Sequence, residues 1–234
     1  MIPVERILEY YFGIVIVLGG LVILLGAKYT LQAWRELPKK GWIGISFALG
    51  LLSLVIASFI EAPFLLLQIW ILLAFVAGVT EEAVKLLPMM FYRDSPAWER
   101  WKLIIGTGLF LGLIEGFLYS TAIVVLGQEA YLIGVRVALV GFHTLWAVIT
   151  AGFMLGEEGL GRLRGLAFSM MAHALYDLPP LAIVQGVSGE LVMLSAIAST
   201  GTMLLTPLMV KESVRRILAT LGDVEEKGEV ISSP

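Results

Sequence analysis

Seven ionisable side chains stand inside stretches of the chain that are otherwise apolar. They are Glu81, Glu82, Lys85, Glu115, His143, His173 and Asp177. The chain has two histidines, and both belong to this set. A charged side chain at the centre of a membrane helix costs roughly 2.5–3.5 kcal/mol or more, so groups of this kind are candidates for a functional site.

Three pairs within the set have the spacing of neighbours on one helix face. Glu81 and Lys85 are four residues apart, and Glu82 and Lys85 are three apart, so one ammonium could neutralise either carboxylate. His173 and Asp177 are also four residues apart, which puts an imidazole and a carboxylate on one face. We therefore expect two local clusters, one around Lys85 and one around His173.

The set is also expected at a common depth in the membrane. A rise of 1.5 Å per residue puts Glu82 and His173 roughly 14 Å from the cytoplasmic ends of their helices, and Glu115, His143 and Asp177 at about 20 Å. These depths agree within the uncertainty of the helix ends. The seven groups could therefore meet in one layer, at the membrane midplane or slightly to its cytoplasmic side.

Carboxylates and histidines in such a layer are suited to the activation of water. Glu81 or Glu82 would act as the general base, with Lys85 deciding which of the two stays ionised. His143 or His173 would donate a hydrogen bond to the oxyanion of a tetrahedral intermediate. The aspartate one turn after the second histidine would fix its tautomer.

A metal site is the alternative use of the same residues. Glu115, His143 and His173 make a plausible set of three zinc ligands with a fourth position open for water. The two histidines lie in different apolar stretches, so this is not the short metalloprotease motif of two histidines on one helix. Both arrangements would hydrolyse a peptide bond within the membrane, and both remain open at this point.

The composition requires a membrane environment for these residues. Hydrophobic residues make up 59% of the 234 positions and charged residues 15%, against roughly 25% charged residues in an ordinary soluble domain. The net charge of −3 provides no basic surface for nucleic acid, and the absence of cysteine excludes thiol chemistry. A soluble enzyme, a nucleic-acid-binding protein and a disordered chain are therefore excluded.

The apolar stretches are long and do not alternate, which predicts helices rather than barrel strands. We expect an all-α, polytopic transmembrane helical bundle with about seven spans. The predicted spans are 9–27, 42–60, 64–91, 103–127, 131–156, 164–186 and 190–210. Residues 1–210 would form a single transmembrane domain whose catalytic layer comes from residues 75–180, followed by a short cytoplasmic tail at 211–234.

The basic residues predict the orientation. Thirteen of the sixteen Lys and Arg residues fall in segments 28–41, 92–102 and 157–164 and in the tail, all on one side of the predicted spans. Because cytoplasmic loops are enriched in Lys and Arg, we expect the N-terminus outside and the C-terminus inside. Glycines at 108, 112 and 116 form a stripe beside Glu115 that would let another helix approach closely.

The order of these motifs resembles that of the PrsW family of intramembrane proteases, which is related to the CAAX prenyl proteases and the bacteriocin-processing immunity proteins. The resemblance covers about residues 75–180. It rests on the sequence EEAVK at 81–85, the segment FLGLIEG at 110–116, His143, and HALYD at 173–177.

The resemblance implies an endopeptidase in a prokaryotic cell membrane that cleaves membrane-embedded substrates toward the cytoplasmic side; in bacterial relatives the implied substrate is an anti-sigma factor. Family members are usually described as metalloproteases, whereas prenyl-protease relatives look like metal-independent glutamate enzymes. Leu86 stands where the CAAX proteases have Arg, which favours the PrsW branch. Gly116 and Asp177 stand where family members often have Asn, while Glu82, Glu115, His143 and His173 occupy the positions that the resemblance implies.

Two function classes follow from these observations. The first is an intramembrane peptidase that acts on a membrane protein or a lipid-anchored peptide, with the bilayer as its environment and no nucleic-acid partner. The second is an ion- or proton-coupled transporter that uses the same buried acids and histidines. The chain shows neither an inverted repeat nor matched pairs of interrupted helices, which counts against the transporter.

Overall fold

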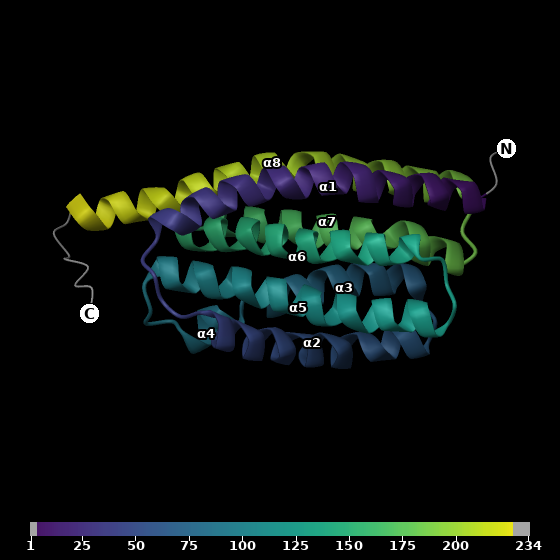
Figure 1. Cartoon of the computed structure of the whole chain (residues 1–234), viewed down its shortest axis with the longest axis horizontal. Helices are drawn as coiled ribbons and strands as arrows, with labels where there is room; N and C mark the ends of the chain where they lie inside the picture. The colour runs from purple at the N-terminus through teal and green to yellow at the C-terminus, as the bar shows by residue number, and fades with distance from the viewer. Residues whose placement is uncertain (1–3, 227–234) are drawn as a thin grey trace.

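The computed structural model describes residues 4–226, which form eight helices and no strand. Figure 1 shows the helices running side by side along the long axis of the molecule. They are α1 (Val4–Glu36), α2 (Ile43–Leu66), α3 (Trp70–Val84), α4 (Leu87–Phe91), α5 (Ala97–Val125), α6 (Tyr131–Gly156), α7 (Gly161–Val184) and α8 (Gly189–Glu226).

The bundle is layered. In Figure 1, α1 and α8 form the upper layer, α6 and α7 lie beneath them, α3 and α5 follow, and α2 with α4 covers the lower side. The helix α5 packs on α6, and α3 packs on α7. The predicted functional residues therefore all come from the four helices in the middle of the bundle.

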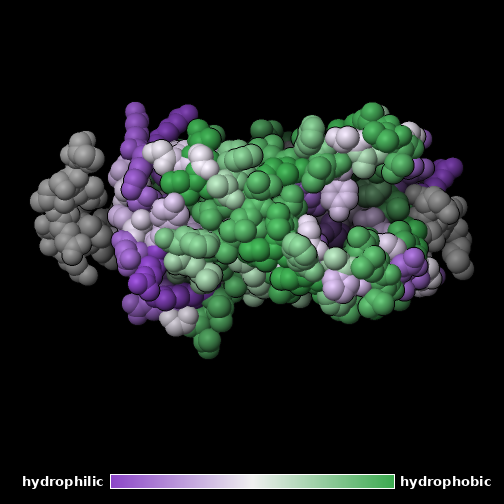
Figure 2. Space-filling model, turned by 90° about the horizontal axis from the view of Figure 1, so that it is seen from below, coloured by the Kyte–Doolittle hydropathy of each residue, from purple (hydrophilic) through white to green (hydrophobic). Residues whose placement is uncertain are grey.

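Six of the helices are long and apolar enough to cross a membrane, which makes this an integral membrane protein. They are α1, α2, α5, α6, α7 and α8. The third predicted span, 64–91, is instead divided between the end of α2, the 15-residue α3 and the short α4. Figure 2 shows an apolar surface over the middle of the bundle and a strongly hydrophilic end, the end where the segments 28–41, 92–102 and 157–164 lie in Figure 1.

The interruption between α3 and α4 follows from Pro88. A proline has no N–H, so it cannot donate the helical hydrogen bond to the carbonyl of Val84 four residues earlier. The hydroxyl of Ser53 on α2 donates to that carbonyl instead, at 3.1 Å. The helix therefore ends at Val84, and Lys85 stands at its C-terminal cap with its side chain fully buried.

The last helix differs from the prediction of a span that ends at 210. The helix α8 continues without interruption to Glu226, because its continuation still packs on the bundle: Ile217 is fully buried and Ser213 donates a hydrogen bond to the carbonyl of Val148 on α6. Residues 227–234 of the predicted tail lie outside the described residues. The fifth predicted span, 131–156, coincides with α6.

Candidate active site in the middle of the bundle

All seven residues selected from the sequence meet in one layer of the bundle. Glu81, Glu82 and Lys85 come from the C-terminal end of α3, Glu115 from α5, His143 from α6, and His173 with Asp177 from α7. Each has a polar atom within 3.9 Å of a polar atom of another member. The expectation that distant motifs converge is therefore confirmed for every member of the set.

Small residues bring the four helices close enough for this. A Cβ atom added to Gly112 on α5 would lie 3.0 Å from the Cβ of His143, so α5 and α6 touch at the histidine. A Cβ added to Gly78 on α3 would lie 2.7 Å from the backbone nitrogen of Ala174, so α3 and α7 touch one residue beyond His173. The predicted close approach at the glycine stripe is thus observed, and α6 is the helix that approaches.

Glu82 and Lys85 form the most deeply buried part of the site. Both side chains are fully buried and form an ion pair through Glu82 Oε1. The same oxygen lies 3.1 Å from His173 Nδ1, while Lys85 Nζ lies 2.9 Å from His143 Nδ1. Glu82 Oε2 has no partner, but the carboxylate is anchored through its other oxygen. The pair therefore contacts both histidines and fixes the side of each ring that faces α3.

The contact with Lys85 defines the tautomer of His143. An ammonium group has only donors, so His143 Nδ1 must be the acceptor of this hydrogen bond. The ring proton then resides on His143 Nε2, which donates to Glu115 Oε2 at 3.1 Å. His173 is held differently, because it has a carboxylate at each nitrogen: Glu82 at Nδ1 and Asp177 Oδ2 at 3.4 Å from Nε2.

Glu81 lacks such anchoring. Its Oε2 atom is buried without a hydrogen-bond partner. This atom lies 3.7 Å from His143 Nε2 and 3.9 Å from His173 Nε2. A buried polar atom without a partner is costly, and its occurrence calls for a bound water, an ion or a functional role. The free carboxylate oxygen and the two inward-facing ring nitrogens thus surround one point in the layer.

Glu81, His143 and His173 form a buried group that could hold a metal ion, since one donor atom from each lies within 4.8 Å of the others. The set expected from the sequence contained Glu115 in place of Glu81. A histidine bound to a metal donates its other ring N–H to an acceptor. His173 meets this condition through Glu82, whereas the second nitrogen of His143 faces the donor Lys85. The donors therefore have a suitable spacing, but His143 does not fit a zinc ligand.

Trp146 packs against the site and was not selected from the sequence. Its ring stacks on His173 with 5.0 Å between centroids, and it lies 5.9 Å from Lys85 Nζ. The side chain is almost fully buried. Trp146 stands three residues after His143, which puts both side chains on one face of the helix. This spacing is the sequence signal that could have identified Trp146.

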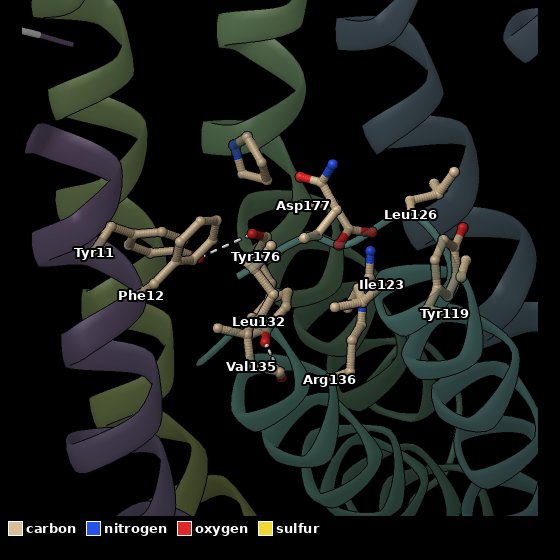
Figure 3. A pocket seen from close by; sticks show the side chains of 13 residues that line it. Tyr11, Phe12, Tyr119, Ile123, Leu126, Leu132, Val135, Arg136, Tyr176 and Asp177 are labelled. Carbon is tan, nitrogen blue, oxygen red and sulfur yellow. Dashed lines mark hydrogen bonds between the residues drawn. The ribbon is translucent and has the colours of Figure 1, made fainter. Parts of the chain in front are cut away.

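Two cavities flank the layer. The larger, about 420 Å³, lies among α1, α5, α6 and α7, and its polar lining includes Asp177 and Arg136. In Figure 3 these two side chains point toward one another, and the guanidinium of Arg136 lies 3.9 Å from the ring centroid of Tyr119. The Tyr11 hydroxyl closes the α1 side of this cavity by donating to the Tyr176 carbonyl at 2.9 Å (Figure 3).

The smaller cavity, about 280 Å³, lies among α2, α3 and α5 and contains an acid that the sequence reasoning left out. Glu61 lines it together with Glu81 and Glu115. From the sequence alone, Glu61 falls at an outer turn just beyond the predicted span 42–60, which favours a solvated side chain. Because α2 extends to Leu66, Glu61 lies within the helix and its Oε1 atom is buried.

Comparisons of the chain with protein-family models, with curated proteins and with solved structures found no match. The functional assignment therefore depends on the geometry of the site and on the motifs from which it was selected.

Proposed function

We propose that this protein is an intramembrane endopeptidase that hydrolyses a peptide bond with a water molecule activated by Glu81. The observation that supports this most directly is the unpaired Glu81 Oε2 atom, which faces the Nε2 atoms of both histidines at 3.7 and 3.9 Å. A water molecule at that point would contact a base and two imidazoles, which supplies a general base for the water and a hydrogen-bond donor for the oxyanion of amide hydrolysis.

In this mechanism Glu81 removes a proton from the water, and the resulting hydroxide adds to the carbonyl carbon of the substrate. The negative charge moves to the carbonyl oxygen of the substrate. This oxygen replaces Glu115 as the acceptor of the hydrogen bond from His143 Nε2–H, and the hydrogen bond stabilises the charge. Glu81 then returns the proton to the nitrogen of the leaving amine as the C–N bond breaks. No proton is left over at the end of the cycle.

The other members of the set act as positioning residues. Lys85 holds His143 in the tautomer that carries the proton on Nε2, and Glu82 pairs with Lys85 and orients His173. Asp177 contacts His173 Nε2, the ring nitrogen that also faces Glu81. Between the two bases considered from the sequence, the geometry favours Glu81, because Glu82 is already engaged by Lys85 and His173.

A bound zinc ion would supply a Lewis acid and an activated water at the same point. Glu81 and His173 have suitable hydrogen-bonding surroundings for such an ion, but His143 does not, so we derive the reaction without it.

The substrate class follows from the position of the site. Since the layer lies within a membrane bundle, the substrate is a membrane protein or a lipid-anchored peptide, and its cleaved segment must be unwound because a helical amide is shielded. The enrichment of Lys and Arg in segments 28–41, 92–102 and 157–164 supports a layer in the cytoplasmic half of the membrane. With the motif resemblance, this gives a prokaryotic cell membrane as the proposed location.

The test compares membranes that contain the wild-type protein with membranes that contain Glu81→Gln at the same level. New protein N-termini are identified by mass spectrometry. We expect a set of cleavage products that the wild type generates and that falls about 10²–10⁴-fold in Glu81→Gln, the range for loss of a general base. The control is Glu190→Gln, an exposed acid at the start of α8. Equal products from wild type and Glu81→Gln would refute the proposal.

The excess of acids in the layer also suits the second function considered, ion- or proton-coupled transport. The two functions differ in a measurable way: proteoliposomes with a transporter show ion flux that depends on Glu81 and release no peptides. Flux without any cleavage product would replace the protease proposal by this alternative.

A further inference from the structure

The cavity among α2, α3 and α5, here called the acidic cavity, has an unusual lining for the interior of a membrane protein. Three of its residues are acids, Glu61, Glu81 and Glu115, and two others, Ser58 and Tyr119, carry hydroxyls. In the part of the chain that the structure describes, no lysine, arginine or histidine lines it. Its volume of about 280 Å³ has room for a single side chain rather than a folded segment.

The acceptors in the acidic cavity exceed the donors. Glu61 Oε1 and Glu81 Oε2 are buried without hydrogen-bond partners, and Glu81 is only 6% exposed. Glu115 uses Oε2 for its contact with His143, which leaves its other oxygen available. Burial of a carboxylate without donors is costly. The unpaired carboxyl oxygens could therefore accept hydrogen bonds from a ligand that has several N–H or O–H donors.

The charge of the surroundings leads to the same conclusion. The basic groups around the acidic cavity already have partners: His143 contacts Glu115, His173 lies between Glu82 and Asp177, Lys85 pairs with Glu82, and Arg136 lies over the ring of Tyr119 and lines the neighbouring cavity. A positive charge from outside the protein would therefore find three carboxyl groups and no competitor within the cavity.

We propose that the acidic cavity binds a primary ammonium group of the substrate, either a lysine side chain or a free N-terminus close to the cleaved bond. This rests on the proposed protease function. An ammonium has three donors, which match one oxygen each of Glu61, Glu81 and Glu115; for Glu81 this is the oxygen other than Oε2, because Oε2 faces the histidines and the reacting water. A metal ion is a poorer fit, because Glu61 does not belong to the buried group with metal-ligand spacing among the described residues.

The position of the cavity fits a role in recognition. Glu81 belongs both to the cavity lining and to the point between the histidines, so an ammonium bound here would lie next to the reacting water. Figure 2 shows a hydrophilic recess in the otherwise apolar surface on the lower side of the bundle, where α2 lies in Figure 1. A membrane-embedded substrate could therefore present its basic group from this side.

Binding is tested on the full-length protein in lipid nanodiscs with octylammonium chloride as the probe and octanol as the uncharged control. The carboxyl groups are labelled with dicyclohexylcarbodiimide, a lipid-soluble reagent, and the labelled residues are identified by mass spectrometry. We expect octylammonium to protect Glu61 and Glu81 at concentrations about tenfold or more below those of octanol, because its contacts are charge-assisted. Equal protection by both compounds, or protection by neither, would overturn the proposal.

A variant sharpens this result. Glu61→Gln should weaken the protection of Glu81 by octylammonium and leave the weak effect of octanol unchanged, whereas Glu190→Gln should change neither. The wild-type comparison of the two compounds needs no variant, so a folding defect in Glu61→Gln cannot produce the expected outcome. If Glu81 stays equally protected in a folded Glu61→Gln protein, Glu61 is not part of the binding site.

Two pairs of membrane-spanning peptides identify the source of the ammonium in the same labelling experiment. One pair has a single lysine or its uncharged analogue norleucine, both with acetylated N-termini, and the other has a free or an acetylated N-terminus without lysine. The proposal expects that, in one of the two pairs, the peptide with the ammonium group protects Glu61 and Glu81 more strongly than its uncharged counterpart. If octylammonium protects Glu61 and Glu81 but the two peptides of each pair protect them equally, the cavity binds only small cations and the proposal fails. These readouts do not require cleavage, so they remain separate from the test of proteolysis with Glu81→Gln.

Discussion

Glu81 and Glu82 are adjacent in the sequence and almost equally buried, yet they have different surroundings. Each has a buried Oε2 atom without a hydrogen-bond partner, but Glu82 is held by Lys85 and His173 through Oε1, whereas no described residue anchors Glu81 in this way. The difference arises from the helix: consecutive residues point about 100° apart, so one carboxylate faces the cap of α3 and the other faces the cavity. The paired acid provides rigidity, and the unpaired acid is available for chemistry.

The largest effect on this contrast is expected from removal of the paired cation. Lys85→Met leaves Glu82 buried without a counter-charge, which typically costs about 3–5 kcal/mol. We expect a loss of this size in the free energy of unfolding, measured by detergent-induced unfolding. In the double variant Lys85→Met/Glu82→Gln most of the loss should be recovered. Additive losses from the two substitutions would show that the ion pair is not coupled.

The contact between Lys85 and His143 also predicts weak zinc binding. In Lys85→Gln the side-chain carbonyl can accept a hydrogen bond from His143 Nδ1, which leaves Nε2 free for a metal. Because partners of metal-bound histidines change affinity by about 10–100-fold, we expect zinc to bind more tightly by that factor than in wild type. The measurement is zinc titration with elemental analysis of purified protein. Stoichiometric zinc in the wild type, lost in His173→Ala, would instead establish a metalloprotease.

The close packing beneath both acids can be tested at Gly112. Gly112→Ala puts a methyl group against the ring and Cβ of His143, so either α5 or α6 must shift. We expect a loss of roughly 1–3 kcal/mol in unfolding free energy, which is the usual cost of overpacking. The rate of substrate cleavage should fall by a larger fraction than the unfolding free energy does. Gly13→Ala is the matched control, because no atom lies within 4 Å of the added Cβ. Equal stability of the two variants would contradict the observed packing.

The smallest effect on stability is expected at the unpaired acid. Glu81→Gln removes no hydrogen bond made by Oε2 in the structure, so the unfolding free energy should change by less than about 1 kcal/mol in the same unfolding assay. Glu82→Gln should cost several times more, because the buried ammonium of Lys85 then loses its counter-charge. Equal losses from the two substitutions would show that the contrast between the carboxylates does not exist.

Much of the site could be predicted because ionisable residues in apolar helices are rare and conspicuous. The sequence identified all seven members of the layer and the glycine stripe that brings α5 and α6 together. It did not identify Glu61, because the helix end was placed at 60 and the structure extends it to Leu66. It also put Glu115 rather than Glu81 among the metal-ligand candidates, since helical spacing does not reveal which of two adjacent carboxylates faces the histidines.

The fold was predicted less evenly. Spans with uniform composition, such as 131–156, coincide with helices of the structure. The predicted span 64–91 was wrong in its continuity, because Pro88 ends the helix and the Ser53 hydroxyl satisfies the carbonyl that the proline leaves free. That compensation depends on a contact between α2 and α3, which is a tertiary feature that a hydropathy pattern does not contain.

The shortness of α3 has a consequence for the biogenesis of the protein. A 15-residue helix with two glutamates and a terminal lysine is a poor substrate for insertion by itself, since each such charge disfavours partitioning by roughly 2.5–3.5 kcal/mol near the helix centre. Its acids find His173 only when α7 has been synthesised, about ninety residues later. Ribosome-bound chains of increasing length should therefore show α3 protected in the membrane only after α7 has emerged. The helix that carries the reactive acid would then be the last of the central four to take its place, and the site would assemble only when the chain is nearly complete.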